Sequence, residues 1–115
     1  MRIESYSFGR IQIDGVGYDK DVILLRGQVI SPWWRSAGGH LFAPGDLSVV
    51  IEAAPEVVCL GTGAFGRVKV EAATLEAFAG NGTEVLQHRT PRAVEEFNRL
   101  SAAGGHVAAA LHLTC

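Results

Sequence analysis

The sequence predicts one α/β domain over residues 1–115, with a mixed, partly parallel sheet and helices packed on it. Two observations lead to this prediction. In the second half of the chain, apolar runs typical of buried strands alternate with helical patterns of about ten residues, which favours right-handed crossovers and parallel strands. In the first third, turn residues separate short β-like runs, which predicts N-terminal β-hairpins. No repeat or linker divides the chain into a second domain.

The first third of the chain is expected to form strands joined by tight turns. Residues 11–13 alternate between apolar and polar side chains, and a turn is expected at residues 14–17. Residues 22–25 form a continuous apolar run that predicts a buried strand. The turn at residues 26–28 then leads into a strand at residues 29–31, which completes a second hairpin.

In the middle of the chain, the spacing of apolar residues changes from that of strands to that of a helix. Residues 36–45 predict a loop, because they contain two adjacent glycines and a proline. Pro44 suits the first turn of a short helix and Pro55 forbids its continuation. The apolar residues 57–60 then predict a buried strand, which is followed by a glycine-rich turn.

Two longer helices and two more strands are expected after this turn. The first helix ends at the glycines of residues 80–82 and precedes a strand at residues 83–88. Thr90 is predicted to cap the second helix, which ends at Gly104 and precedes a final strand at residues 106–113. The apolar side chains expected to face the core are Leu75, Phe78 and Ala79 in the first helix and Val94, Phe97 and Leu100 in the second.

Charge and cysteine usage restrict the partners and the compartment. Ten Lys and Arg against twelve Asp and Glu give a net charge of −2 with no charged block, which argues against nucleic acid and anionic membranes as partners. Cys59 and Cys115 show neither CxxC spacing nor a disulfide framework. Because there is also no secretory or mitochondrial leader and no apolar run of roughly 18 residues, we expect a cytoplasmic protein.

Residues 61–66 match the GxGxxG pattern of dinucleotide-binding loops and follow a predicted strand. In those loops the last glycine opens a helix whose N-terminus holds the pyrophosphate, whereas here the β-like residues 67–70 follow. Glu84, the nearest candidate for the acidic partner, begins the next strand and does not end it. A nucleotide site of this kind is therefore disfavoured.

A more general anion site remains an alternative for the same loop. Glycines at the carboxyl end of a parallel strand expose backbone N–H groups, and a cationic side chain follows them directly. A simpler interpretation is a tight turn beneath a packed Phe65. The candidate ligand-binding residues are Thr62, Gly63, Gly66 and Arg67, with His40 from the separate loop.

Trp33, Trp34 and Arg35 are the candidate protein-contact residues. Consecutive side chains of an extended segment point to opposite faces, so one tryptophan can be buried while the other is exposed. An exposed Trp beside an Arg is typical of protein-contact hot spots and can also stack on a planar ligand. The alternative is that both tryptophans pack beneath the loop that follows.

Other chemistry-bearing residues form no recognisable set. His106 and His112 lie roughly 20 Å apart on an extended strand and cannot share a metal ion. His112, among apolar neighbours, is expected to be a core histidine, and Cys59 is expected to be a core cysteine. No GxSxG elbow is present, so the sequence assigns no catalytic residues, although residues distant in sequence can still meet in a site. We expect no metal site and no cofactor.

Four segments together resemble a known family. They are residues 19–23 (DKDVI), residues 31–35 (SPWWR), Gly61-Thr62-Gly63 with Gly66-Arg67, and residues 108–115 (AAALHLTC). The chain resembles the family of small domains of unknown function that includes the adipogenesis-associated domain protein and mitochondrial complex I assembly factor 3. The resemblance implies a three-layer α/β fold with a mixed sheet, no established enzymatic activity, and assembly or regulatory roles in eukaryotic members.

Two hypotheses of function follow from the sequence. The first is a non-catalytic protein-binding or assembly-factor-like module that contacts an unidentified protein partner through residues 33–35. The alternative is a protein or enzyme that binds a small anionic ligand at the glycine loop. A wide apolar patch would favour the first hypothesis and a concave basic cleft the second. The oligomeric state is not determined by these patterns.

Overall fold

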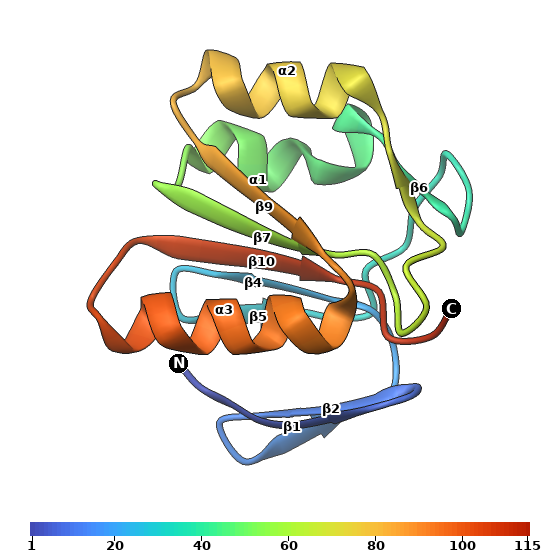
Figure 1. Cartoon of the computed structure of the whole chain (residues 1–115), viewed down its shortest axis with the longest axis vertical. Coiled ribbons are helices and arrows are strands. Elements are labelled where there is room, and N and C mark those ends of the chain that lie inside the picture. Colours follow the sequence, from blue (N-terminus) through green and yellow to red (C-terminus); the bar gives the residue numbers. More distant parts are fainter.

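A five-stranded mixed sheet forms the middle layer of the computed structural model, which describes residues 1–115 (Figure 1). The strand order is β5-β4-β10-β7-β9. Strands β7 (Val57–Gly61), β9 (Glu84–His88) and β10 (Val107–Leu111) are parallel to one another. Strand β4 (Val22–Leu25) runs antiparallel to both of its neighbours, β10 and β5 (Gln28–Ile30). The predicted α/β class with a mixed, partly parallel sheet is confirmed.

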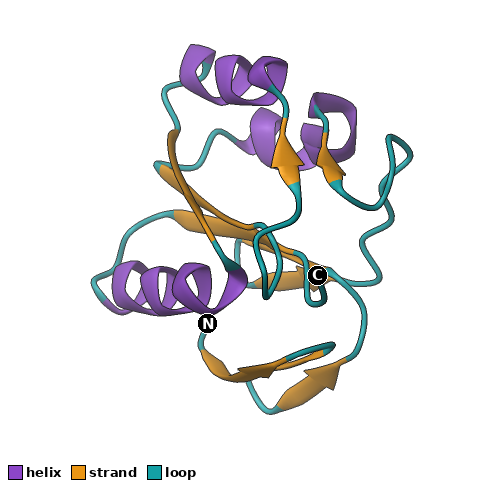
Figure 2. Cartoon of the chain, turned by 45° about the vertical axis from the view of Figure 1, so that its right-hand side comes forward, coloured by secondary structure: helices purple, strands orange, loops and turns teal.

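Helix α3 and an N-terminal sheet cover one face of the central sheet (Figure 2). The helix spans Thr90–Ala102, and the antiparallel sheet contains β1 (Ile3–Ser7), β2 (Arg10–Ile13) and β3 (Val16–Tyr18). Apolar side chains of both meet the sheet in one continuous core. Large members of this core are Ile3, Ile11, Ile13, Leu24, Phe97 and Leu113.

The opposite face is covered by the 3₁₀ helix η1 (Pro44–Leu47), helix α1 (Ser48–Ala53) and helix α2 (Ala72–Gly80). Two short parallel strands, β6 (Leu41–Phe42) and β8 (Lys69–Val70), pair beside these helices. The second core includes Ile23, Trp33, Phe42, Leu47, Leu60 and Phe78. Because helices or strands cover both faces, the three-layer arrangement implied by the family resemblance is present.

The central strand β10 shows why its sequence is apolar throughout. All five of its residues are buried, with Ala109 facing the first core and Ala108 and Ala110 facing the second. A strand covered on both faces has no solvent side, so polar alternation is absent. Small side chains here let α3 and Phe78 pack from the two sides.

Two helix predictions are wrong in detail. Leu75 and Ala79 lie on the exposed side of α2, and the buried side is formed by Thr74 and Phe78. Thr74 is buried because its Oγ1 donates a hydrogen bond to the Phe42 carbonyl at 2.7 Å. The apolar pattern of a nine-residue helix with many alanines did not fix its orientation.

Thr90 does not cap α3, because its hydroxyl has other partners. Its Oγ1 donates to the His112 carbonyl at 2.6 Å and accepts from the Gly63 N–H at 2.9 Å. The hydroxyl therefore ties the start of α3 to the glycine loop and to the end of β10. Val94 and Phe97 are buried as predicted, and Leu100 is half-buried against the same core.

Two loops also differ from expectation. The turn between β2 and β3 is limited to Asp14 and Gly15, both with positive φ, so β3 begins within the predicted turn. The predicted loop at residues 36–45 contains strand β6, which pairs with β8 at a distance along the chain.

No helix is both long and apolar enough to cross a membrane.

Candidate functional site

A pocket of about 450 Å³ opens at the edge of the sheet where β4 begins and β10 ends. Its size lies within the usual range for small-molecule sites, roughly 300–1,000 Å³. Polar side chains outnumber apolar ones in its wall. The side chains and glycine that line it are Asp19, Lys20, Asp21, Pro32, Trp33, Trp34, Arg35, Gly39, His112, Leu113 and Thr114.

The strand register brings Asp21 and His112 together. In the antiparallel pair β4·β10, Val22 lies opposite Leu111, so the residues just outside the two strands are also neighbours. His112 Nδ1 lies 2.7 Å from Asp21 Oδ2, and the Leu113 N–H donates to Asp21 Oδ1 at 2.8 Å. Two residues separated by 91 positions thereby form one polar contact.

Arg35 completes a buried ionic cluster with these two side chains. Its Nη1 donates to Asp21 Oδ2 at 2.7 Å, and its Nη2 donates to the Gly39 carbonyl at 2.6 Å. The guanidinium lies over two aromatic rings, with its Cζ 4.8 Å from the ring centroid of Trp33 and 5.3 Å from that of Phe42. Only 4% of the Arg35 side chain is exposed, and its Nε has no hydrogen-bond partner.

The segment that carries Arg35 is held on both sides of Trp34. Trp33 is buried, and its Nε1 donates to the Asp46 carbonyl at 2.9 Å. The Asp46 carboxylate accepts hydrogen bonds from the N–H groups of Ser36 and Ala37. The prediction that one tryptophan is buried and the other exposed is confirmed, because Trp34 is 75% exposed at the rim of the pocket.

The electrostatics of the cluster favour an ionised Asp21. Burial opposes its negative charge, but hydrogen bonds from His112, the Leu113 N–H and Arg35 outweigh burial, so the pKa of Asp21 lies below its ordinary value. Tyr6 lies nearby and donates its hydroxyl to the Leu113 carbonyl at 2.8 Å. Burial and the negative charge of Asp21 raise the pKa of Tyr6.

The glycine loop lies at the same end of the sheet, but its backbone N–H groups donate hydrogen bonds to other parts of the chain. The N–H groups of Ala64 and Arg67 donate to the carbonyls of Thr114 and Cys115 at 2.7 and 3.1 Å. Gly63 donates to Thr90, as described above. These N–H groups are therefore not presented to an anion, and the anion site assigned to Thr62, Gly63, Gly66 and Arg67 stays a prediction.

Gly63 has a structural reason to be a glycine. Its φ is +104°, and a Cβ at this position would lie 2.4 Å from the carbonyl carbon of Cys115. Both the backbone conformation and the close approach exclude a side chain. The glycine-rich pattern here is thus explained by packing of residues 61–63 against residues 114–115.

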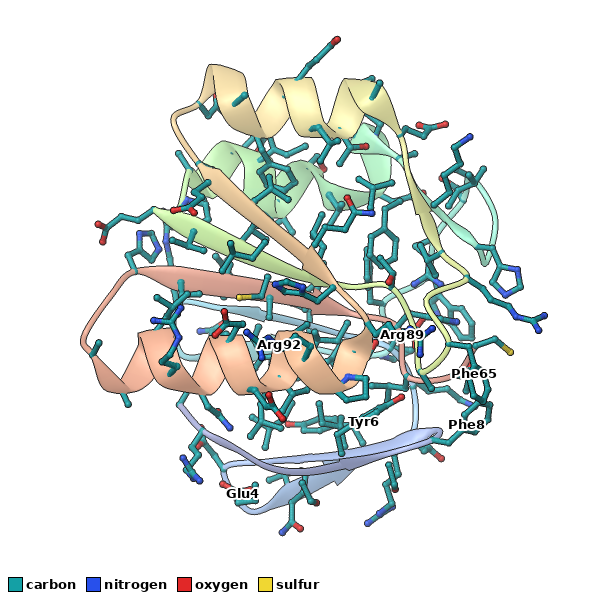
Figure 3. All side chains as sticks on the ribbon, in the orientation of Figure 1. Glu4, Tyr6, Phe8, Phe65, Arg89 and Arg92 are labelled. Carbon is teal, nitrogen blue, oxygen red and sulfur yellow. The ribbon has the colours of Figure 1, made fainter.

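His40 lies beside His112, which lines the pocket. It is exposed, and its ring lies edge-on to that of His112 with centroids 6.0 Å apart. Phe65 in the glycine loop is 59% exposed, so it is not packed over the turn as the simpler interpretation required. Figure 3 shows Phe65 beside Phe8, and their ring centroids are 6.1 Å apart.

Five polar residues that line the pocket were not among the sequence-based candidates: Asp19, Lys20, Asp21, His112 and Thr114. His112 is buried and hydrogen-bonded, as expected for a core histidine, yet it also lines the pocket. Their positions were the available signal in the sequence, since Asp21 directly precedes one apolar run and His112 directly follows the apolar residues 107–111. No three His, Cys, Asp or Glu side chains converge as metal ligands.

A mixed central sheet is covered on one face by α3 with the N-terminal sheet and on the other by η1, α1 and α2, which defines a small α/β domain of the three-layer class. An ionic cluster lies at the edge where β4 meets β10. A family model described as "Protein of unknown function (DUF498/DUF598)" matches residues 3–112. The chain belongs to this family, which confirms the resemblance recognised in the sequence. Because the family is described by its unknown function, membership supplies the fold and no assignment of catalytic residues.

Solved structures agree with this classification. The chain is similar to the conserved hypothetical protein PH1505 from Pyrococcus horikoshii OT3, with 23% identity, a TM-score of 0.85 and full coverage of both chains. It is also similar to MT938, with 23% identity, a TM-score of 0.83 and coverage of 99% and 98%. A Bordetella pertussis protein described as a Mth938-like domain shares 22% identity over 97% of this chain and 85% of its own, with a TM-score of 0.70.

Proposed function

We propose that this protein is a protein-binding module whose contact surface is centred on Trp34 and the adjoining pocket. The observation that carries the proposal is the 75% exposure of a tryptophan between two anchored neighbours. Tryptophan is among the residues most enriched in binding hot spots. A large side chain exposed on an ordered segment loses little conformational freedom when a partner covers it, which favours affinity.

The neighbours of Trp34 support an interface of mixed character. Lys20 and Asp19 at the pocket rim provide charges of both signs, while Trp33 and Arg35 fix the backbone from below. An aromatic anchor surrounded by polar groups is the common anatomy of protein interfaces. The partner is a polypeptide, and an assembly-factor-like role is the form of this function that the family resemblance suggests.

A ligand-binding function is the second candidate, and one observation favours it. The pocket is concave, and a buried Asp21–Arg35 ion pair lies in its wall. Convergent buried polar groups in a pocket of this size are typical of small-molecule sites. This candidate moves the site from the glycine loop to the pocket while keeping His40 near it.

Affinity capture from extracts of the organism that encodes the chain tests the first proposal. A Trp34→Ala protein should retain the captured partner at least about tenfold less than the natural protein, because a hot-spot tryptophan contributes about 2 kcal/mol. Leu75→Ala is the matched control, since Leu75 is an exposed apolar residue on α2. Equal capture by the natural protein and Trp34→Ala would contradict the proposal.

A further inference from the structure

Three side chains beside the pocket form a hydrogen-bonded chain of the kind that activates a hydroxyl group. Asp21 Oδ2 lies 2.7 Å from His112 Nδ1, and His112 Nε2 lies 3.2 Å from Thr114 Oγ1. A carboxylate on one ring nitrogen and a hydroxyl on the other is the arrangement of an orienting acid, a general base and a nucleophile. All three residues line the same pocket.

The charges around His112 determine which ring nitrogen carries the proton. His112 Nδ1 lies 2.7 Å from Asp21 Oδ2, which accepts hydrogen bonds only, and 3.2 Å from Arg35 Nη2, which donates to the Gly39 carbonyl at 2.6 Å. The shorter contact with the carboxylate places the ring proton on Nδ1. Arg35 Nη1 bonds the same carboxylate oxygen and keeps it in place. The lone pair of Nε2 is therefore directed toward the Thr114 hydroxyl and accepts its hydrogen bond.

Thr114 is held in position by contacts on both sides. Its carbonyl accepts from the Ala64 N–H at 2.7 Å, and the preceding Leu113 carbonyl accepts from the Gly9 N–H at 2.9 Å. Its methyl group Cγ2 faces the turn at Gly9, where a Cβ would lie 3.8 Å away. The backbone of Thr114 is thus held in place, its hydroxyl lies 3.2 Å from His112 Nε2, and the half-buried residue lines the pocket.

We propose that Thr114 is an acyl-accepting nucleophile, that His112 is its general base, and that the substrate class is a small acyl ester that fits the pocket. This activity is independent of partner binding through Trp34. Asp21 and Arg35 act as positioning residues, because they orient His112 without touching the substrate. Lys20, which lines the pocket, supplies positive charge for the oxygen that becomes negative in the transition state.

The reaction proceeds in two balanced steps. As Thr114 Oγ1 forms a bond to the acyl carbon, His112 Nε2 takes the hydroxyl proton. The tetrahedral intermediate then breaks its bond to the alcohol oxygen, and the alcohol leaves with the proton from His112. Water attacks the resulting acyl–Thr114 ester by the same route, which releases the carboxylic acid and restores the free hydroxyl.

p-Nitrophenyl acetate is the probe for this proposal, used with a Cys115→Ala protein so that the neighbouring thiol does not react. Nitrophenolate release should be accompanied by a single acetyl group, located on Thr114 by peptide mass spectrometry. Thr114→Val and His112→Gln in the same background should slow release at least about 100-fold, the size expected for loss of a nucleophile or a general base. Thr114→Ser should restore the acetylation, because it returns the hydroxyl.

Ser48→Ala and His106→Gln are the matched controls, since the Ser48 hydroxyl is on an exposed residue of α1 and His106 lies at the opposite end of β10. Both should react like the Cys115→Ala parent. Acetylation at another residue, or equal rates for Thr114→Val and Thr114→Ser, would overturn the assignment. Thr114→Val and Thr114→Ser change a half-buried side chain by few atoms, so the comparison stands even if His112→Gln fails to fold.

Discussion

The glycine loop at residues 61–67 and the tryptophan segment at residues 33–35 meet the same residues, 112–115, but use their polar groups in opposite ways. The loop donates its N–H groups to the carbonyls of Thr114 and Cys115. The tryptophan segment instead brings Arg35 to Asp21 and His112 around a pocket. The N–H groups of the glycine motif thus hydrogen-bond to the chain itself, whereas the tryptophan segment lines the cavity.

Breaking the ionic cluster should produce the largest effect on stability. Arg35→Met leaves the mostly buried Asp21 carboxylate without its cation, and loss of one partner of a buried pair costs about 3 kcal/mol. The free energy of unfolding, measured by urea denaturation, should fall accordingly. Arg92→Met on the exposed face of α3 should leave the unfolding midpoint unchanged. Equal effects of the two substitutions would mean that the ionic cluster does not contribute to the free energy of unfolding.

The packing role of the glycine loop predicts a somewhat smaller loss. Gly63→Ala combines a positive φ with a clash against Cys115, so the free energy of unfolding should fall by about 2 kcal/mol. Gly80→Ala is the control, because nothing lies within 4 Å of its Cβ position at the end of α2. Thermal unfolding of both proteins checks this prediction, which would be wrong if Gly63→Ala melted with the natural protein.

Protonation of Asp21 at low pH should weaken the ionic cluster that holds Arg35. The pKa of Asp21 in the folded protein lies below the ordinary 3.8, so the unfolded chain takes up a proton at higher pH than the folded one. Stability from this group is complete above pH 3.8 and is lost as the pH falls through the folded pKa. Asp21→Asn should reduce stability at neutral pH and flatten its acid dependence. An unchanged acid dependence would exclude Asp21 as the source.

The two cysteines give the smallest and simplest test. Burial in the core raises the pKa of the Cys59 thiol to about 12, whereas Cys115 is half-exposed beside the glycine loop. Iodoacetamide at neutral pH should therefore modify one thiol in the folded protein and two after unfolding. Mass spectrometry identifies the modified residue, and labelling of Cys59 in the folded state would show that the core opens readily.

Much of the fold follows from local patterns in the sequence. The apolar runs at residues 22–25 and 57–60 predict buried strands, and the proline-opened helix with Val94 and Phe97 forms as expected. The face of α2 was not predictable from pattern alone, because Thr74 is buried by a hydrogen bond to the distant Phe42 carbonyl. Thr90 was misassigned for the same reason, since its partners Gly63 and His112 are far away in the sequence.

The candidate site was only half predictable. The exposed tryptophan follows from the alternation of an extended segment, and Trp34 is the exposed member. Asp21 and His112 come together only through the register of β4 and β10, which depends on long-range pairing that no local pattern encodes. A polar residue next to the end of a buried strand is the signal that points to such positions.

Hydrogen–deuterium exchange of the complex with a captured partner tests most directly whether the functional surface lies at the tryptophan segment. Exchange should slow at residues 33–36 and at residues 19–21, which line the pocket, relative to the free protein. Residues 61–67 should exchange equally in both states, because their N–H groups already bond the chain itself. Slowed exchange at residues 61–67 with no change at residues 33–36 would contradict the account and return the functional site to the glycine loop.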